Sequence, residues 1–357
     1  MFAAMNLELL REAFVGTVTA ASVSRTPSRS ALAVPTTRNK LETALANLRG
    51  LCGTLSVQGV ACLRELLIRD RPALVWLDTS ILGTLIPLIR SLLPETGIVC
   101  AFQNVEADLL RQRVAAMQVH YLPALWATRY NEVQSARDAD LTLALHPSDA
   151  SRIESLYGRR VDRILPIIVP ETNCQLHDRG PNSGGAPPYA LFVGSAFPPN
   201  IEALEFMCRQ VAPRLQGMRL LAVGSGLEAF ASRFNLPKLE IKGFVEDLSS
   251  VYNDAAAVVA PIFSGGGMKV KIAEALMHGK TVIASPFAAL GFEGCDNGSV
   301  RLAHTPDEFA LQLACIGNRW FNHGARADYE KHFSHSAGLC RVAEIVAALR
   351  SKTSALC

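Results

Sequence analysis

The stretch of sequence best suited to chemistry is a run of three glycines, Gly265–Gly267, within Ala260–Gly279 (APIFSGGGMKVKIAEALMHG). Tandem glycines before a helix free the backbone to direct several N–H groups, and the positive helix end, toward one anion. A phosphate is the natural ligand, and Lys269 and Lys271 could add positive charge to a diphosphate. Glu274 shares nearly the same helix face as Lys271, where its carboxylate could accept hydrogen bonds from a ribose diol. The simpler interpretation is a glycine-rich turn with surface lysines.

A second glycine pattern suggests a different chemistry. Gly224, Gly226 and Ala229 satisfy GxGxxG/A after a short apolar run, and Glu246 follows about 20 residues later, as in dinucleotide-binding proteins. An NAD(P)-binding Rossmann enzyme is therefore one alternative. Asp138-Ala139-Asp140 resembles a metal-binding DxD, although carboxylates at a helix end are the simpler interpretation.

Short apolar runs predict the elements that position these patterns. In the second half they mostly end in Gly, Pro or Ser, and a helix-compatible stretch follows each; they span 190–194, 220–224, 239–243, 257–261 and 281–285. The first half repeats this alternation less clearly, at 74–77, 98–102, 141–145 and 161–165. Runs apolar on both faces and separated by helices are typical of parallel sheets covered on both sides. We therefore predict an α/β protein of two Rossmann-like, doubly wound domains facing across a cleft, where ligands usually bind.

The domain boundaries follow from one break in composition. Residues 171–188 (ETNCQLHDRGPNSGGAPP) are polar and rich in Gly and Pro, which predicts a linker. We expect an N-terminal domain over 1–170 and a C-terminal domain over 189–335. Residues 336–357 are expected to form a closing helix and tail, because apolar residues recur there at helical spacing.

Composition excludes several classes of protein. The 357 residues are 49% apolar and 19% charged, with a formal net charge of +3, which argues against disorder and against a nucleic-acid partner. The mean hydropathy is +0.20, but we find no run of about 20 apolar residues that could cross a membrane. Charged residues near the start also break any signal-peptide core, so we expect a cytoplasmic protein. The nine cysteines and eight histidines show no metal-binding spacing, so no metal is expected.

The sequence resembles family 4 of the retaining, GT-B-fold glycosyltransferases, also called the group 1 glycosyl transferases. Several motifs carry the resemblance in their expected order: FVGSAFPPNIEALEF (192–206), LLAVGSG (220–226), IKGFVEDLSSVYNDAAAVVAPIFSGGGMKVKIAEALMHGKTVIAS (241–285) and GFEG (291–294). In that family the second domain binds a nucleotide-diphosphate sugar and the first binds the acceptor. The donor is a substrate, so the resemblance implies no cofactor.

The resemblance also implies roles for individual residues of the second domain. Glu274 matches the second glutamate of the family's E-x7-E motif, which binds the donor ribose, and the glycines and lysines beside it would face the diphosphate and sugar. The residues expected to bind the donor are Gly194, Ser195, Gly224, Gly226, Phe244, Val245, Gly265, Gly266, Gly267, Met268, Glu274 and Glu293. Lys269 and Lys271 are expected to act in catalysis by neutralising the leaving diphosphate.

In the first domain, AFQNVEADL (101–109) looks like the family's HN-x-E segment. Gln103 replaces the His that commonly touches the donor sugar, and we expect it to act beside the lysines in catalysis. Asn104, Glu106 and Arg111 are expected to bind the acceptor. A basic and aromatic segment, from Arg111 through His120 and Trp126 to Arg129, could contact anionic lipid or receive a lipid-linked acceptor. The alternative is a solvated helix with a core Trp.

Three departures from the family leave an alternative open. Gly266 stands where the first glutamate of E-x7-E is usual, Gln103 cannot take a proton, and Met1–Ser22 offers neither the family's opening strand nor its Gly-rich loop. We therefore expect the first domain to lack those two elements. The implied function is retaining sugar transfer from a nucleotide-diphosphate sugar to a hydroxyl acceptor, in bacterial polysaccharide, lipopolysaccharide or other glycoconjugate synthesis. A catalytically silent GT-B protein that binds a nucleotide sugar is the second hypothesis.

Overall fold

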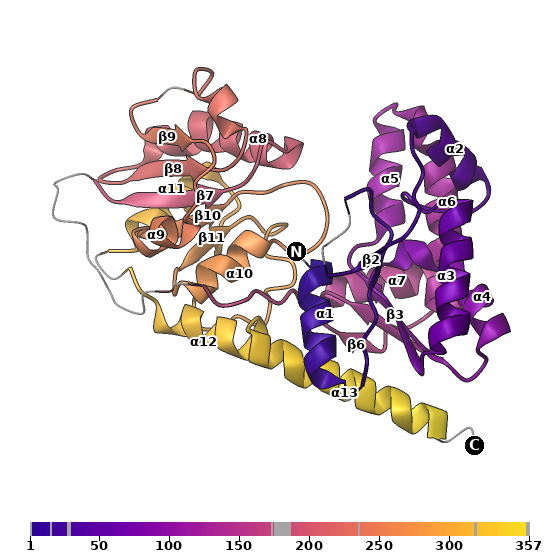
Figure 1. Cartoon of the computed structure of the whole chain (residues 1–357). Helices are drawn as coiled ribbons and strands as arrows, with labels where there is room; N and C mark the ends of the chain where they lie inside the picture. The colour runs from indigo at the N-terminus through magenta and orange to yellow at the C-terminus, as the bar shows by residue number, and fades with distance from the viewer. Residues whose placement is uncertain are drawn as a thin grey trace. The chain divides into compact units, whose positions relative to one another are not determined.

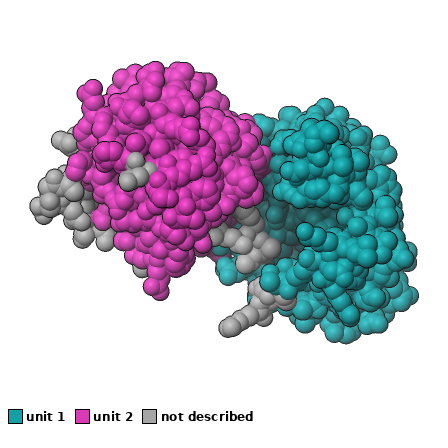
Figure 2. Space-filling model, turned by 90° about the horizontal axis from the view of Figure 1, so that it is seen from above, with its two compact units in different colours: residues 1–166, 338–357 teal, residues 167–337 magenta. Residues whose placement is uncertain are grey.

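The computed structural model describes residues 2–14, 16–26, 30–172, 174, 187–234, 236–317 and 320–354. The chain forms two compact units (Figure 2): unit 1 comprises 1–166 and 338–357, and unit 2 comprises 167–337. Most of the predicted linker, 171–188, lies outside the described residues. The predicted closing helix is α13 (His335–Ser354), which begins in unit 2 and ends in unit 1.

Unit 2 contains a six-stranded, all-parallel sheet in the order β12-β11-β10-β7-β8-β9, of which Figure 1 labels β7 to β11. Its strands are β7 (Tyr189–Val193), β8 (Arg219–Val223), β9 (Leu239–Lys242), β10 (Ala257–Ala260), β11 (Val282–Ala284) and β12 (Val300–Leu302). The chain starts in the middle at β7, runs outward to β9, and then returns to the other side of β7 at β10. This reversal is the switch point of doubly wound sheets, beside which ligands bind at the carboxyl ends of the strands.

The helices of unit 2 lie between its strands or follow the last of them. They are α8 (Pro198–Phe206), α9 (Leu248–Asn253), α10 (Val270–Met277), α11 (Pro306–Ala314) and α12 (His323–His332). Helix α10 shows why the sequence folds locally this way: Ile272, Ala275 and Leu276 are fully buried, and they recur at the spacing that places them on one helix face. This buried face fixes the start of α10 beside the end of β10.

Unit 1 contains a four-stranded parallel sheet in the order β3-β4-β5-β6, which is also the order along the chain. Its strands are β3 (Leu74–Leu77), β4 (Gly97–Phe102), β5 (Leu141–Ala144) and β6 (Arg163–Ile164). Every residue of β4 is buried, as expected for a strand covered on both faces. The helices are α1 (Phe2–Ala13), α2 (Lys40–Leu48), α3 (Val57–Asp70), α4 (Leu85–Leu92), α5 (Glu106–Ala115), α6 (Leu122–Asp138) and α7 (Pro147–Tyr157).

The predicted α/β class with parallel sheets is confirmed, and the nine predicted apolar runs coincide with strands to within two residues at each end. Three short strands were not predicted: β12, and the pair β1 (Ala21–Ser22) and β2 (Leu32–Ala33), which form a separate parallel sheet. Within the described part of residues 1–22, the chain forms α1 and then β1, neither of which joins the four-stranded sheet as a strand. No helix among the described residues is both long and apolar enough to cross a membrane.

Candidate functional site

The central feature of unit 2 is a lysine held across the switch point of the sheet. Asn200 lies in the first turn of α8, after β7, and Lys271 lies in the first turn of α10, after β10. The Lys271 Nζ donates a hydrogen bond of 2.8 Å to Asn200 Oδ1, and Asn200 Nδ2 donates one of 3.0 Å to the Ser195 carbonyl. The ammonium also lies 4.3 Å from the ring centroid of buried Phe192. One amide therefore ties the two neighbouring loops together and positions the lysine between them.

The charge on Lys271 is poorly compensated within the protein. Burial lowers the pKa of its ammonium to about 7, and repulsion by Lys269 adds to the shift, while the Glu274 carboxylate opposes it. A diphosphate beside Lys271 would favour the charged form and raise this pKa again. The site is therefore complementary to an anion.

The glycine run before α10 forms a tight loop. Gly265 and Gly267 have φ of 106° and 62°, a region that L-residues with side chains rarely adopt, which explains why glycine is needed there. The Lys269 Nζ donates to the carbonyls of Gly266 (3.0 Å) and Gly267 (2.6 Å) and lies 4.8 Å from the Phe287 ring centroid. Lys269 thus holds the loop closed as well as supplying charge.

Glu274 is oriented by a buried tyrosine. The Tyr252 hydroxyl donates a hydrogen bond of 3.0 Å to Glu274 Oε2, and the Tyr252 ring stacks on His278 at 5.0 Å between ring centroids. Burial raises the pKa of Glu274, and the bond from Tyr252 acts in the opposite direction. The carboxylate is therefore fixed in direction, with Oε2 held by the protein.

Gly224 and Gly226 allow two loops of unit 2 to approach each other closely. A Cβ on Gly224 would lie 2.0 Å from the Gly194 carbonyl oxygen, and one on Gly226 would lie 2.8 Å from the Ala196 Cβ. A hydrogen bond of 2.9 Å from the Ala196 amide to the Ser225 carbonyl joins the same loops. The pattern follows β8, the second strand of unit 2 along the chain, and its last three positions lie in a four-residue 3₁₀ helix, Leu227–Phe230. A dinucleotide fingerprint instead follows the first strand and opens an α-helix.

The other predicted donor-binding residues of unit 2 lie in loops. Phe244, directly after Gly243 beyond β9, is 76% exposed, and half-buried Val245 follows it. Met268 is buried, and its side chain fills the space in which a Cβ on Gly291 would stand. Both carboxylate oxygens of Glu293 accept hydrogen bonds from the Gly291 amide, at 3.1 and 3.0 Å, so Glu293 stabilises its own turn.

In unit 1, Gln103 forms hydrogen bonds with Asp78, a residue that was not among the predicted site residues. Gln103 follows β4 and Asp78 follows β3, so both lie at the carboxyl ends of neighbouring strands. Gln103 Nε2 donates to the Asp78 carbonyl (2.8 Å) and to Asp78 Oδ2 (3.1 Å), while Asn6 and Trp76 donate to Asp78 Oδ1 at 2.6 and 3.3 Å. Burial raises the pKa of Asp78. Because the Gln103 amide nitrogen bonds to Asp78, its Oε1 is the atom oriented to accept a hydrogen bond.

A buried glutamate fixes the loop that carries Asn104 and Glu106. Glu132 of α6 accepts hydrogen bonds from the backbone amides of Glu106 (2.8 Å) and Ala107 (3.2 Å) at the start of α5. The Tyr157 hydroxyl also donates to it at 2.6 Å, and burial raises the pKa of Glu132 to about 7. Asn104 Nδ2 donates to Glu106 Oε1 at 3.0 Å. Asn104 and Glu106 are therefore held together after β4.

Arg111 lies apart from this group, further along α5. Its guanidinium pairs with Asp108 at 2.9 Å, and Asp108 also accepts two hydrogen bonds from Arg152. Arg111 therefore belongs to an ion-pair network between α5 and α7, whereas Gln103, Asn104 and Glu106 closely follow the end of β4.

The DxD pattern and the acidic, His and Cys side chains were also considered as metal ligands. Asp140 Oδ2 accepts hydrogen bonds from the Ile98 amide and forms an ion pair with Arg90, both at 2.7 Å, which gives the DxD pattern a structural role. No group of three or more His, Cys, Asp or Glu side chains in the described part of the chain is arranged to hold a metal ion.

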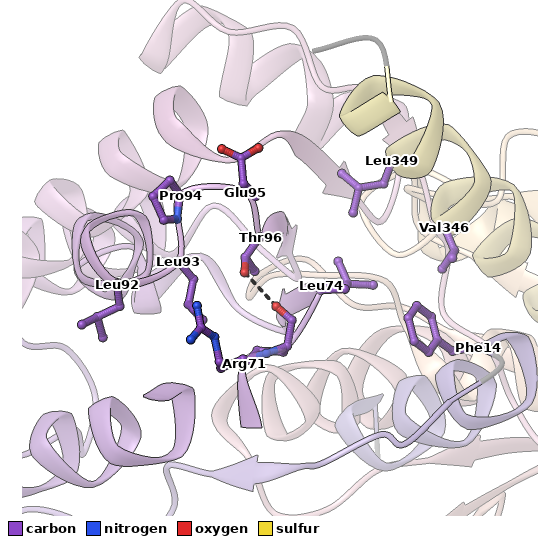
Figure 3. A pocket seen from close by; sticks show the side chains of 12 residues that line it. Phe14, Arg71, Leu74, Leu92, Leu93, Pro94, Glu95, Thr96, Val346 and Leu349 are labelled. Carbon is purple, nitrogen blue, oxygen red and sulfur yellow. Dashed lines mark hydrogen bonds between the residues drawn. The ribbon is translucent and has the colours of Figure 1, made fainter. Parts of the chain in front are cut away.

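A cavity of about 590 Å³ in unit 1 is largely apolar (Figure 3). Its lining includes Phe14, Arg71, Leu74, Thr96, Val346 and Leu349. Leu74 is the first residue of β3, so the cavity lies at the amino end of that strand, away from Asp78. It does not belong to the group around Gln103.

Comparisons with known proteins agree with this geometry. Residues 187–317 match the family described as glycosyl transferases group 1. No curated protein sequence matches the chain significantly.

Three solved structures are similar to the chain in fold. Sucrose-phosphate synthase from Thermosynechococcus elongatus has a TM-score of 0.64 at 16% identity, covering 83% of this chain and 78% of the other. Anabaena HepE in complex with UDP-glucose has a TM-score of 0.60 at 15% identity, covering 82% of each chain. The lipopolysaccharide outer core galactosyltransferase WaaB has a TM-score of 0.58 at 14% identity, covering 82% and 79%. Residues 187–317 of unit 2 therefore match the group 1 glycosyl transferases, and the chain has the GT-B fold of these neighbours.

Proposed function

We propose that the protein transfers a sugar, with retention of configuration, from a nucleotide-diphosphate sugar to a hydroxyl acceptor. The observation that carries this proposal is Lys271, held by Asn200 at the switch point of unit 2 with a pKa lowered to about 7. A half-buried cation at that position, beside a glycine loop and a helix start, suits a diphosphate. HepE, which has a similar fold, is described in complex with UDP-glucose, which supports a nucleotide-sugar donor.

Different residues of unit 2 would bind the diphosphate, the ribose and the base of the donor. Lys271, the Lys269-held loop and the backbone amides at the start of α10 would bind the diphosphate. Glu274, whose Oε2 is held by Tyr252, would accept hydrogen bonds from the ribose hydroxyls through its other oxygen. Exposed Phe244 and its neighbour Val245 lie after β9, where backbone groups would contact the base.

Transfer of this type needs little from a side-chain base. The leaving phosphate helps to deprotonate the acceptor hydroxyl on the donor's own face, as in the family that the sequence resembles. The protein must then stabilise the charge that grows on the departing diphosphate, which preoriented cations and N–H groups do well in a site that excludes water. Gln103, with its amide nitrogen bonded to Asp78, would accept a hydrogen bond from a hydroxyl of the transferred sugar.

Unit 1 supplies the acceptor side in this proposal. Asn104 and Glu106, fixed by Glu132, offer polar groups to a glycan or lipid-linked hydroxyl, and Arg111 would contact charge further out. The proposed pathway is the synthesis of a bacterial polysaccharide, lipopolysaccharide or another glycoconjugate. The proposed location of the protein is the cytoplasm, at the inner face of the membrane.

The test begins with a thermal-shift screen against UDP-, GDP- and ADP-sugars and NAD(P). We expect one class of nucleotide sugar to raise the melting temperature, and then to be hydrolysed or transferred by the wild-type protein. The Glu274→Ala variant should lose that activity, while Lys331→Gln, at an exposed position of α12, should keep it. Stabilisation by NAD(P) alone would exclude the proposal, and donor binding with no turnover for any acceptor or water would indicate the silent protein.

A further inference from the structure

Helix α2 of unit 1 exposes its leucines. Leu41, Leu45 and Leu48 are 71%, 53% and 62% exposed, and their i, i+4, i+7 spacing places them on one helix face. The buried residues of α2, Ala46 and Asn47, lie on the opposite face. A surface helix normally turns its apolar face to the core, so this helix presents the reverse arrangement.

The exposed apolar surface continues onto α6, which packs beside α2 (Figure 1). Tyr130 lies against the end of α2, because a Cβ on Gly50 would be 3.3 Å from its ring, and Asn131 donates a hydrogen bond of 2.7 Å to the Gly50 carbonyl. Trp126 stacks on Tyr130, with ring centroids 6.0 Å apart and an interplanar angle of 15°. Trp126 is 54% exposed, so it is not the core Trp of the alternative interpretation. The α2–α6 surface is defined here as Leu41, Leu45, Leu48, Leu122, Trp126 and Tyr130, each at least 42% exposed.

The segments that carry the α2–α6 surface have mainly positive charges at their exposed positions. Residues 38–49 and 112–131 contain Arg38, Lys40, Arg49, Arg113 and Arg129, all exposed, against a single acidic residue, Glu42. The Glu42 carboxylate accepts a hydrogen bond from the Arg38 backbone amide. An apolar surface of leucine, tryptophan and tyrosine with arginines and lysine around it is complementary to the interface of a membrane with anionic lipids.

We propose that the α2–α6 surface binds an anionic lipid bilayer. The leucines and Trp126 enter the boundary between headgroups and acyl chains, and the basic side chains contact lipid phosphates. The inference goes beyond sugar transfer, because it concerns a surface of unit 1 that needs no donor. It would also bring unit 1 to membrane lipids, among them a lipid-linked acceptor.

Co-sedimentation with lipid vesicles tests the proposal. The wild-type protein is expected to bind vesicles of phosphatidylcholine mixed with phosphatidylglycerol, and to bind phosphatidylcholine alone far more weakly. Its tryptophan emission should shift to the blue on binding, since Trp126 is exposed whereas Trp76 is half-buried and Trp320 is buried. The shift should vanish in Trp126→Phe.

A variant with Leu41, Leu45 and Leu48 all changed to Gln is expected to bind the mixed vesicles at least about tenfold more weakly, since each leucine loses its apolar burial in the interface. The matched control is Leu311→Gln, which removes a leucine that is 64% exposed on α11 of unit 2 and should bind like wild type. All four leucines are exposed, so an unchanged melting temperature is expected and confirms folding.

Several outcomes would overturn the proposal. They are equal vesicle binding by the triple variant and wild type, no binding of the wild type to anionic vesicles, and light scattering that shows a wild-type dimer which the triple variant loses. The last result would assign the surface to a second copy of the chain. The nucleotide-sugar screen uses no lipid, so its failure leaves the vesicle result intact and distinguishes the two proposals.

Discussion

The two sheets of the molecule differ in the way they bring side chains together. In unit 2 the strand order reverses between β7 and β10, and the hydrogen bond from Lys271 to Asn200 joins the helices that follow these two strands. In unit 1 the described strands follow chain order from β3 to β6 without a reversal, and Asp78 and Gln103 meet simply because β3 and β4 are neighbours. A reversed strand order therefore creates a site for a whole ligand, whereas the unreversed order places only a few polar groups along one edge.

The two units also differ in which ionisable groups have shifted pKa values. In unit 2 burial lowers the pKa of a lysine, which makes the site complementary to an anion. In unit 1 burial raises the pKa of two carboxyl groups, Asp78 and Glu132, that orient neighbouring amides. Diphosphate binding is thus expected of unit 2, and hydrogen bonding to neutral hydroxyls of unit 1.

The largest effect is expected from removing the charge at the switch point. Lys271→Gln should lower kcat/KM for the donor by about 10² to 10³, as does the loss of one preoriented group that stabilises transition-state charge. Steady-state kinetics with the donor found by screening would measure it. Gln103→Ala in unit 1 should cost less, about tenfold. An equal loss in the two variants would remove the contrast between the units.

The next largest effect, a loss of stability, is expected where two loops of unit 2 approach each other at Gly224. Gly224→Ala would place a Cβ 2.0 Å from the Gly194 carbonyl oxygen, so the loops must separate. We expect the free energy of unfolding of unit 2 to fall by about 3 kcal/mol, measured by urea denaturation. Gly217→Ala also has a positive φ, 67° against 155° at Gly224, but no atom lies within 4 Å of the added Cβ, so it should cost only about 1 kcal/mol. Similar losses at the two positions would show that the close approach is unimportant.

The pH dependence offers a smaller effect with a definite sign. The pKa of Lys271 in the folded protein, about 7, lies below its ordinary value of 10.5, so the unfolded chain binds more protons between these values. Without ligand, the free energy of unfolding should therefore gain a contribution that rises with pH over this window. Donor affinity should instead fall, by up to about tenfold per pH unit above 7, because the diphosphate requires the charged lysine.

Both pH trends should be lost in Lys271→Gln. Calorimetric titrations and thermal unfolding from pH 6 to 9 would measure them. A donor affinity that stays constant over this range in the wild type would show that Lys271 is not the group that titrates.

The smallest effect is expected at the ribose carboxylate. Tyr252→Phe removes the hydrogen bond to Glu274 Oε2 and should weaken donor binding about threefold to tenfold. Calorimetry of the donor with this variant would measure the change. The counterpart in unit 1, Tyr157→Phe, removes the bond to Glu132 and should leave donor affinity unchanged. A matching loss in Tyr157→Phe would mean that the units do not divide the work as described.

The sequence predicted the strands well because runs buried on both faces carry a strong apolar pattern. It missed β12, whose residues are half-buried or exposed, and the two-residue strands β1 and β2. Of the site, it predicted the residues that glycine spacing and charge indicate. Asn200 and Tyr252 were missed as partners because only the strand order brings them to Lys271 and Glu274.

The missed residues of unit 1 differ in how far the sequence could have revealed them. Asp78 directly follows the strand 74–77, and the position of ligand sites at the carboxyl ends of strands could have drawn attention to it. Glu132 lies within a 17-residue helix whose apolar pattern is weak, so nothing in the sequence signals that this glutamate is fully buried. Its partners come from α5 and α7, which only tertiary packing brings together.

The most direct test of the central claim is a pair of calorimetric titrations, with the nucleoside diphosphate of the donor and with the corresponding nucleoside. The wild-type protein should bind the diphosphate about 10² times more tightly or better, because Lys271 interacts with the phosphates. In Lys271→Gln this preference should collapse while nucleoside binding stays the same. If the variant kept the full preference for the diphosphate, the lysine at the switch point would not be the group that recognises it.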